Sequence, residues 1–346
     1  MSVDASPATP APLGKIRDFV LASPHRLAMP ILSFPGVKLT GVSVRELVTN
    51  PPAQVAVQRL LQQKYRTSFM LSAMDLSVEA EAFGSEIRME DAEIPCVTNR
   101  LVTDDAQISR LEVPAVGTKR TAVYLETVRL LAAKPTGTWI LGGMIGPFSL
   151  AARLYGVSEA LQDTLNQPEM IHALLEKATA FLLAYAEAFK RAGARGIIIA
   201  EPTAGLISPN AVVSFSSPYI RQIVKRVADD DFEVILHNCG ARLAHLPATL
   251  QSGAQIYHFG KTMDIPAALA RTPADVVLCG NLDPAAIFVG CDPAGVRERT
   301  AALLQATKAS RAFVVSSGCD IPPDAPLANV DAFFDAIRDF QTSIVP

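Results

Sequence analysis

A histidine and two cysteines follow apolar runs at two widely separated points of the chain. The run at 234–236 leads into His237 and Cys239, and the run at 312–315 leads into Cys319. Both runs have the length and composition of buried strands. Imidazole nitrogen and thiolate sulfur are ligands that zinc prefers, and a site with three protein ligands keeps a coordination position open, as catalytic zinc sites do. The pattern therefore indicates a catalytic zinc site made from two strand ends.

The other three cysteines lack this pattern. Cys96, Cys279 and Cys291 are dispersed, and a single cysteine is usually a small buried hydrophobic residue. His-x-Cys is a weaker signal than Cys-x-x-Cys, so local spacing alone leaves the metal site and ordinary core packing equally open. Widely spread cysteines in a long chain do not resemble a disulfide framework. We therefore expect a reducing, cytoplasmic location.

The composition excludes several classes of protein. The chain has 346 residues, 49% of them hydrophobic, and its 31 basic and 34 acidic residues give a net charge of −3. There is no Lys/Arg-rich run to bind nucleic acid and no apolar run long enough to cross a membrane. Residues 1–13 are rich in Ala and Pro and do not resemble a signal peptide. We predict a disordered lead-in over 1–13 and a single domain over 14–346.

Short apolar runs alternate with amphipathic segments along the chain. We predict eight strands, near residues 27, 68, 138, 196, 233, 255, 276 and 312, most of them followed by a helix. Such alternation predicts an α/β protein with a (β/α)8 TIM barrel, here with N-terminal helices and an inserted hairpin excursion at 78–117. A doubly wound open sheet is the alternative, but no Gly-x-Gly-x-x-Gly follows any strand.

The barrel brings further polar residues to the same rim as the cysteines. Residues just past the strand ends of a TIM barrel share one face, which places the three candidate zinc ligands together. The same argument adds five residues to that rim: Asp75, Glu201, His258, Asn281 and Asp283. This convergence favours the metal site over three unrelated core residues.

Three motifs connect the chain to a known family. They are His-Asn-Cys-Gly at 237–240, Gly-Asn-Leu-Asp-Pro at 280–284 and Ser-Gly-Cys-Asp-Ile-Pro at 317–322. With these motifs the chain resembles the uroporphyrinogen decarboxylase superfamily, and within it the zinc-dependent methylcobamide:thiol methyltransferases, such as those acting on coenzyme M. The resemblance covers nearly the whole chain after about residue 14. It implies that His237, Cys239 and Cys319 bind Zn²⁺.

The resemblance also implies an activity. A zinc-activated thiol attacks the methyl group of methylcobalamin, a corrinoid carried by a corrinoid-binding protein. The acceptor stays open among coenzyme M, homocysteine and tetrahydrofolate. Glu201 and Asp75 are candidate catalytic residues, and His258, Asn281 and Asp283 are candidate contacts to the cofactor. Each of these five has an ordinary structural alternative, such as capping a loop or forming an internal hydrogen bond.

Two other functions remain open at this point. The decarboxylase branch carries an Arg-Gln-Ala-Gly-Arg motif after its first strand, but this chain reads Ser-Phe-Pro-Gly-Val at 33–37. The missing arginines argue against a pocket for a porphyrinogen with many carboxylates, although Asp75 falls where that branch keeps its essential Asp. The second alternative is a non-catalytic corrinoid-docking protein with a structural zinc.

Overall fold

The computed structural model describes residues 14–344, so the predicted lead-in at 1–13 lies outside the described residues. Seven parallel strands form one curled sheet in the order β1-β4-β5-β6-β7-β8-β9. In chain order these strands are β1 (Phe69–Leu71), β4 (Trp139–Ile145), β5 (Gly196–Ala200), β6 (Glu233–Asn238), β7 (Ile256–Phe259), β8 (Val277–Leu282) and β9 (Phe313–Ser317). The fold is α/β and TIM-barrel-like, as predicted.

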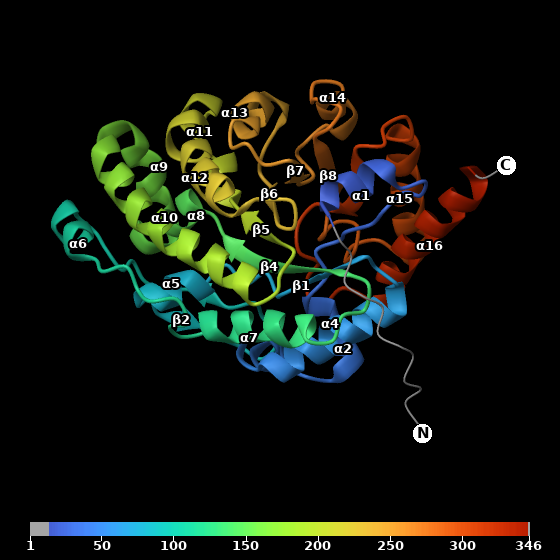
Figure 1. Ribbon diagram of the computed structural model, residues 1–346, viewed down its shortest axis with the longest axis horizontal. Coiled ribbons are helices and arrows are strands. Elements are labelled where there is room, and N and C mark those ends of the chain that lie inside the picture. Colours follow the sequence, from blue (N-terminus) through green and yellow to red (C-terminus); the bar gives the residue numbers. More distant parts are fainter. Residues whose placement is uncertain (1–13, 345–346) are drawn as a thin grey trace.

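Helices surround this sheet on its outer side, as Figure 1 shows for α10, α12, α15 and α16. Before β1 come α1 (Ile16–Ala22), η1 (Phe34–Gly36), α2 (Val37–Thr40), α3 (Val44–Thr49) and α4 (Pro51–Tyr65). Between β1 and β5 come α5 (Val78–Phe83), α6 (Asp105–Arg110), α7 (Thr121–Ala132), α8 (Pro147–Tyr155), α9 (Val157–Asn166) and α10 (Pro168–Arg191). After β5 come η2 (Pro202–Gly205), α11 (Pro209–Phe215), α12 (Ser217–Val227), η3 (Leu243–His245), α13 (Leu246–Leu250), α14 (Ile265–Leu269), α15 (Pro293–Ala306) and α16 (Leu327–Ile344).

The strands are buried on both faces, which explains their nearly continuous apolar sequences. In β5, Ile197 and Ile199 belong to the core between the sheet and the helices, whereas Ile198 and Ala200 belong to a second core inside the curl. This alternation follows from the two-residue period of a strand. Every second residue therefore points into the barrel, up to the strand ends where the candidate site lies.

The prediction of a first strand near residue 27 is wrong. That segment makes only one isolated bridge, between Ala28 and Val315. Met29 donates its backbone N–H to the carbonyl of Val315, at 3.0 Å, but Pro30 has no N–H with which to continue a ladder. The segment therefore lies beside β9 without extending the sheet to β1.

The predicted N-terminal helices and inserted hairpin are confirmed. The hairpin consists of β2 (Ile87–Arg88) and β3 (Cys96–Val97), which pair antiparallel. Helix α1 packs into the inner core: Ile16 and Val20 are buried there, and the ring of Phe19 lies 4.3 Å from that of Trp139. Because Trp139 begins β4, α1 covers the end of the barrel opposite the candidate site. None of the helices within residues 14–344 combines the length and the apolar character that a bilayer crossing requires.

Candidate metal centre

The three predicted ligands lie together at the C-terminal rim of the sheet. His237 is on β6, Cys239 follows that strand, and Cys319 follows β9. One imidazole nitrogen and the two Sγ atoms all lie within 4.8 Å of one another. No fourth His, Cys, Asp or Glu belongs to this group in the described part of the chain. The arrangement therefore has the donor set and ligand number of a zinc site that accepts an outside ligand.

The imidazole of His237 has a nitrogen available for a metal. The residue is only 2% exposed, its Nδ1 lies 2.8 Å from Nδ1 of His258, and its Nε2 is buried without a hydrogen-bond partner among the described residues. A buried nitrogen without a partner is unfavourable in a protein unless something binds it. The group around His237 thus fits a metal ion.

A hydrogen bond between the two thiols moves their pKa values in opposite directions. A hydrogen bond from Cys319 lowers the pKa of Cys239, against the opposing effect of burial. The same hydrogen bond, followed by burial, raises the pKa of Cys319 to about 12. Of the two thiols, Cys239 is therefore the first to ionise. Both cysteines are partly exposed, so a ligand can approach from solvent.

A glycine allows the loops of the rim to approach closely. A Cβ atom at Gly260 would lie 2.2 Å from the carbonyl oxygen of Cys239 and 2.7 Å from its Cα. Any other residue there would push the loop after β7 away from the backbone of Cys239. Gly260 therefore fixes the position from which the Cys239 thiol faces Cys319.

His258 is the one predicted cofactor contact that touches a candidate ligand directly. It lies on β7 in register with His237 on β6, and it is fully buried. Its Nε2 lies 2.7 Å from Oγ of Ser316. Burial, and then the neighbouring His237, lowers the pKa of His258 well below its usual value. His258 is therefore a neutral neighbour of the site, and its role as a cofactor contact stays a prediction.

Glu201 lies behind the rim with its carboxylate fully engaged. Its oxygens accept hydrogen bonds from the backbone N–H groups of Phe148 and Ser149, at 2.9 and 2.8 Å, and from Oγ of Ser216. These amides begin α8, so the carboxylate caps a helix N-terminus. Burial raises the pKa of Glu201, and these hydrogen bonds lower it. A catalytic role for Glu201 stays a prediction beside this structural one.

Asp75 lies in a buried ion pair. Its carboxylate contacts the guanidinium of Arg120 and accepts hydrogen bonds from the N–H and Oγ of Ser77. Arg120 also contacts Glu81, at 2.6 Å. The Asp75 side chain has no exposed surface. Its contacts hold the loop after β1 to the residue that precedes α7, and its catalytic role stays a prediction.

Asn281 and Asp283 stabilise turns at the end of β8. Asn281 donates Nδ2 to the carbonyls of Gly260 and Met263, at 3.1 and 2.6 Å. Asp283 pairs with Lys261 at 2.6 Å and accepts the backbone N–H groups of the following turn. Asn281 thus supports the Gly260 loop beside Cys239. Contact of either residue with a cofactor stays a prediction.

Comparison with known proteins places the chain in a family. The profile of the uroporphyrinogen decarboxylase (URO-D) family matches residues 13–340. The chain belongs to this family. A methylcobamide:CoM methyltransferase, MtbA of Methanosarcina acetivorans, is 29% identical over 271 residues, which cover 77% of this chain and 78% of that protein. A uroporphyrinogen decarboxylase of Desulfotalea psychrophila is 28% identical over 302 residues, which cover 84% of this chain and 87% of that one.

One solved structure has a similar fold. A methyltransferase from Methanosarcina mazei superposes with a TM-score of 0.83 and 23% identity, and the match covers 93% of this chain and 97% of that one. This likeness shows the fold. Since methyltransferases and decarboxylases of the URO-D family match at nearly equal identity, identity alone does not choose between their activities.

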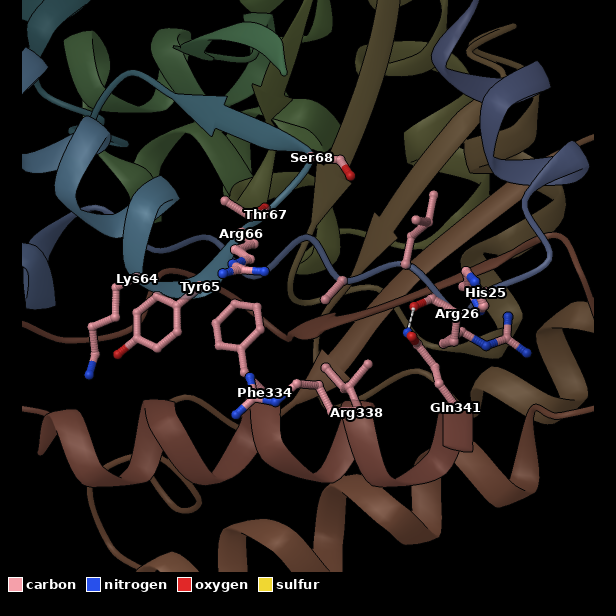
Figure 2. Close-up of a pocket in the computed structure, with 13 residues that line it drawn as sticks. His25, Arg26, Lys64, Tyr65, Arg66, Thr67, Ser68, Phe334, Arg338 and Gln341 are labelled. Atoms are coloured by element: carbon pink, nitrogen blue, oxygen red, sulfur yellow. Dashed lines mark hydrogen bonds between the residues drawn. The ribbon is translucent and has the colours of Figure 1, made fainter. Parts of the chain in front are cut away.

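Figure 2 shows a separate cavity of about 530 Å³ in this URO-D protein. Because residues 64–68 in its lining directly precede β1, it lies at the N-terminal end of the sheet, away from the strand ends that carry the candidate site. Its lining residues come from the segment at 25–28, from residues 64–68 before β1 and from α16, and several are cationic. Lys64 pairs with Asp331 and Arg338 pairs with Asp335, while Arg66 forms the C-cap of α4, where a cation is favourable. The cavity's charges therefore have local explanations, and none of the eight predicted site residues lines it.

Ser316 supports the site from β9 and was not among the residues predicted from the sequence. Ser316 follows Val314 by two residues on β9, so both side chains point to the same face of the sheet, and Val314 belongs to the inner core. A hydroxyl at an inward position of an apolar strand was the available signal. Glu79 was also missed, because it lies in a helical stretch where carboxylates are usually exposed.

Glu79 gives a prediction for the pH dependence of stability. Burial raises its pKa to about 8 from 4.5, against a hydrogen bond from the N–H of Ile145. The folded protein then binds a proton that the unfolded chain has lost between those pH values, so stability should fall as pH rises from about 5 to 8, with a slope of up to about 1.4 kcal/mol per pH unit.

Urea unfolding at several pH values tests this expectation. Glu79→Gln should flatten the slope, whereas the exposed control Glu112→Gln should keep the wild-type slope. Equal slopes in Glu79→Gln and the wild type would show that Glu79 is not the group that takes up the proton.

Proposed function

We propose that this protein moves a methyl group from a methylated corrinoid, held by a corrinoid-binding protein, to a small-molecule thiol. The observation that carries the proposal is the cluster of His237, Cys239 and Cys319 with its unpartnered buried nitrogen. A zinc ion held there would lower the pKa of a thiol placed at its remaining coordination position and so supply a thiolate near neutral pH.

The residues of the chain have separate tasks in this reaction. His237, Cys239 and Cys319 would hold the zinc ion, and the partial exposure of the two cysteines lets the thiol and the corrinoid approach from the rim. The thiol proton leaves to solvent. The sulfur then bonds to the methyl carbon, while the cobalt–carbon bond breaks and its electron pair stays on cobalt as cob(I)alamin. No protein group has to donate or accept a proton during the methyl transfer itself.

The segment at 33–37 favours this activity over porphyrinogen decarboxylation. In the decarboxylase branch this position carries the arginine-containing motif, but here Ser33 and Phe34 are fully buried. A Cβ at Gly36 would lie 2.5 Å from a methyl carbon of Val57, so the turn packs tightly under α4. It offers no cation to a substrate carboxylate.

Methyl transfer can be measured directly with free methylcobalamin as donor. Under anaerobic conditions the zinc-loaded protein should convert methylcobalamin to cob(I)alamin, seen by absorbance, with at least one thiol from a panel that includes coenzyme M and homocysteine. His237→Ala should abolish the reaction because it removes one of three ligands. Glu201→Gln should retain zinc, since the hydrogen bonds of the Glu201 carboxylate go to Phe148, Ser149 and Ser216 and to none of the three candidate ligands.

Two controls separate the alternatives. Uroporphyrinogen should release no carbon dioxide in the same preparation, and tetrahydrofolate tests the non-thiol acceptor. Decarboxylation without methyl transfer would overturn the proposal in favour of the decarboxylase. Tight zinc binding with no transfer to any acceptor, from either free or protein-bound corrinoid, would favour a docking protein with a structural zinc.

A further inference from the structure

A continuous line of hydrogen bonds runs from the candidate ligand His237 across the top of the barrel interior. His237 Nδ1 lies 2.8 Å from His258 Nδ1, and His258 Nε2 lies 2.7 Å from Ser316 Oγ. Ser316 Oγ in turn donates to the carbonyl oxygen of Met29, at 2.6 Å. Both histidines are at most 2% exposed and Ser316 is fully buried. The line joins β6, β7, β9 and the segment after α1.

The last member of this line fixes the direction of every bond. The carbonyl of Met29 can only accept, so it takes the single proton of the Ser316 hydroxyl. Ser316 Oγ can then only accept from His258, which places the proton of His258 on Nε2. A neutral imidazole has one N–H, so Nδ1 of His258 is an acceptor and Nδ1 of His237 must donate to it. The Nε2 atom of His237 is left with a free lone pair.

The opposite order does not fit these contacts. If His237 carried its proton on Nε2, its Nδ1 would need a proton from His258 Nδ1. A neutral His258 would then require Ser316 to donate to its Nε2, but the only hydroxyl proton is already given to Met29. The planes of the two rings are inclined at 72° and their centroids lie 4.7 Å apart, with the two Nδ1 atoms between them at 2.8 Å. Such an approach suits an in-plane N–H···N bond.

We propose that His258 and Ser316 are positioning residues that hold His237 as its Nδ1–H tautomer, so that its bare Nε2 faces the sulfurs of Cys239 and Cys319. This inference rests on the proposed function for its purpose, since a metal needs that lone pair. Partners that hold the second nitrogen of a histidine ligand typically change metal affinity about 10–100-fold when removed. In this role His258 acts through His237 and needs no contact with the substrate.

The proton order can be read without any metal. The chain has five histidines, so ¹⁵N-labelled histidine in the metal-free protein gives a small set of imidazole signals that long-range ¹H–¹⁵N spectra assign to tautomers. We expect His237 as the Nδ1–H form and His258 as the Nε2–H form. In the Ser316→Ala variant, His258 should appear as a mixture of its Nδ1–H and Nε2–H tautomers. A wild-type His237 that carries its proton on Nε2 would overturn the proposal.

Zinc affinity, measured by competition with a chelator, gives the second test. His258→Phe keeps a ring but removes both nitrogens, so zinc should bind about 10–100-fold more weakly. His258→Asn places an amide oxygen close to the position of Nδ1 and should restore most of the affinity. The matched control is His172→Phe, because His172 is also bonded to a side chain through Nδ1, namely to Tyr219 at 2.7 Å, but lies outside the candidate site.

The outcomes distinguish this inference from the proposed function. A wild-type protein that binds no zinc would contradict the proposed function, while the tautomer spectra would still decide the proton order. Zinc bound equally tightly by the wild type and His258→Phe would overturn the positioning role alone. If His258→Phe does not fold, Ser316→Ala and His258→Asn decide the same question, since the first should weaken zinc binding more than the second.

Discussion

Cys239→Ala and Cys319→Ala should each reduce bound zinc from about one ion per chain to almost none and abolish methyl transfer. Each cysteine supplies one of only three ligand atoms in the cluster, and the remaining pair of donors cannot complete a tetrahedral zinc site with one outside ligand. The loss should exceed the ~10–100-fold effect of removing a partner that only supports a ligand. Elemental analysis of the purified variants measures this directly.

The other cysteines provide matched controls for this experiment. Cys96 lies in the hairpin strand β3 and Cys291 lies before α15, so Cys96→Ala and Cys291→Ala should keep both zinc and activity. Fully active Cys239→Ala and Cys319→Ala proteins, or metal-free wild-type protein with full activity, would show that the cluster is not the catalytic centre.

Arg120→Met should lower the free energy of unfolding by about 3–5 kcal/mol, because it leaves the buried carboxylate of Asp75 without its cation. The two side chains are 7% and 0% exposed, so water cannot replace the lost partner. Arg120 also donates to Oγ of Ser77, at 2.8 Å, and that bond is lost as well. Urea unfolding at neutral pH measures the change.

A double variant and a surface variant complete this test. Arg120→Met with Asp75→Asn should be more stable than the sum of the single changes predicts, since no unpaired charge stays buried. Arg129→Met removes an exposed pair with Glu126 and should cost less than about 1 kcal/mol. Additive effects of the two changes at 75 and 120 would show that the pair does not stabilise the fold.

The sequence alone predicted that His237, Cys239 and Cys319 lie together on one rim of the barrel, and their positions in the structure confirm that proximity. The types of His237, Cys239 and Cys319 are local information, and their positions after apolar runs identify strand ends. The C-terminal ends of parallel strands lie at one edge of a barrel whatever the details of packing, so their proximity followed from the predicted fold. The hairpin and the N-terminal helices could also be predicted, because turn residues and hydrophobic periodicity are local features of the sequence.

Only the tertiary structure decided which partners the polar groups around His237, Cys239 and Cys319 contact. The pairing of His237 with His258 depends on the register of β6 and β7, and no local pattern specifies a register between two strands. Likewise Glu201 reaches the first turn of α8 and Asp75 reaches Arg120, contacts that depend on how the loops cross the rim.

The conformation of the segment after α1 depends both on its local sequence and on its tertiary contacts. Its apolar residues predicted a strand near 27, but Pro30 limits the pairing with β9 to one bridge. The carbonyl of Met29 is thereby available to accept the proton of Ser316, which orders the protons along the line to His237. A backbone carbonyl carries no signature in the sequence, since every residue has one. Its direction is set only when the chain folds.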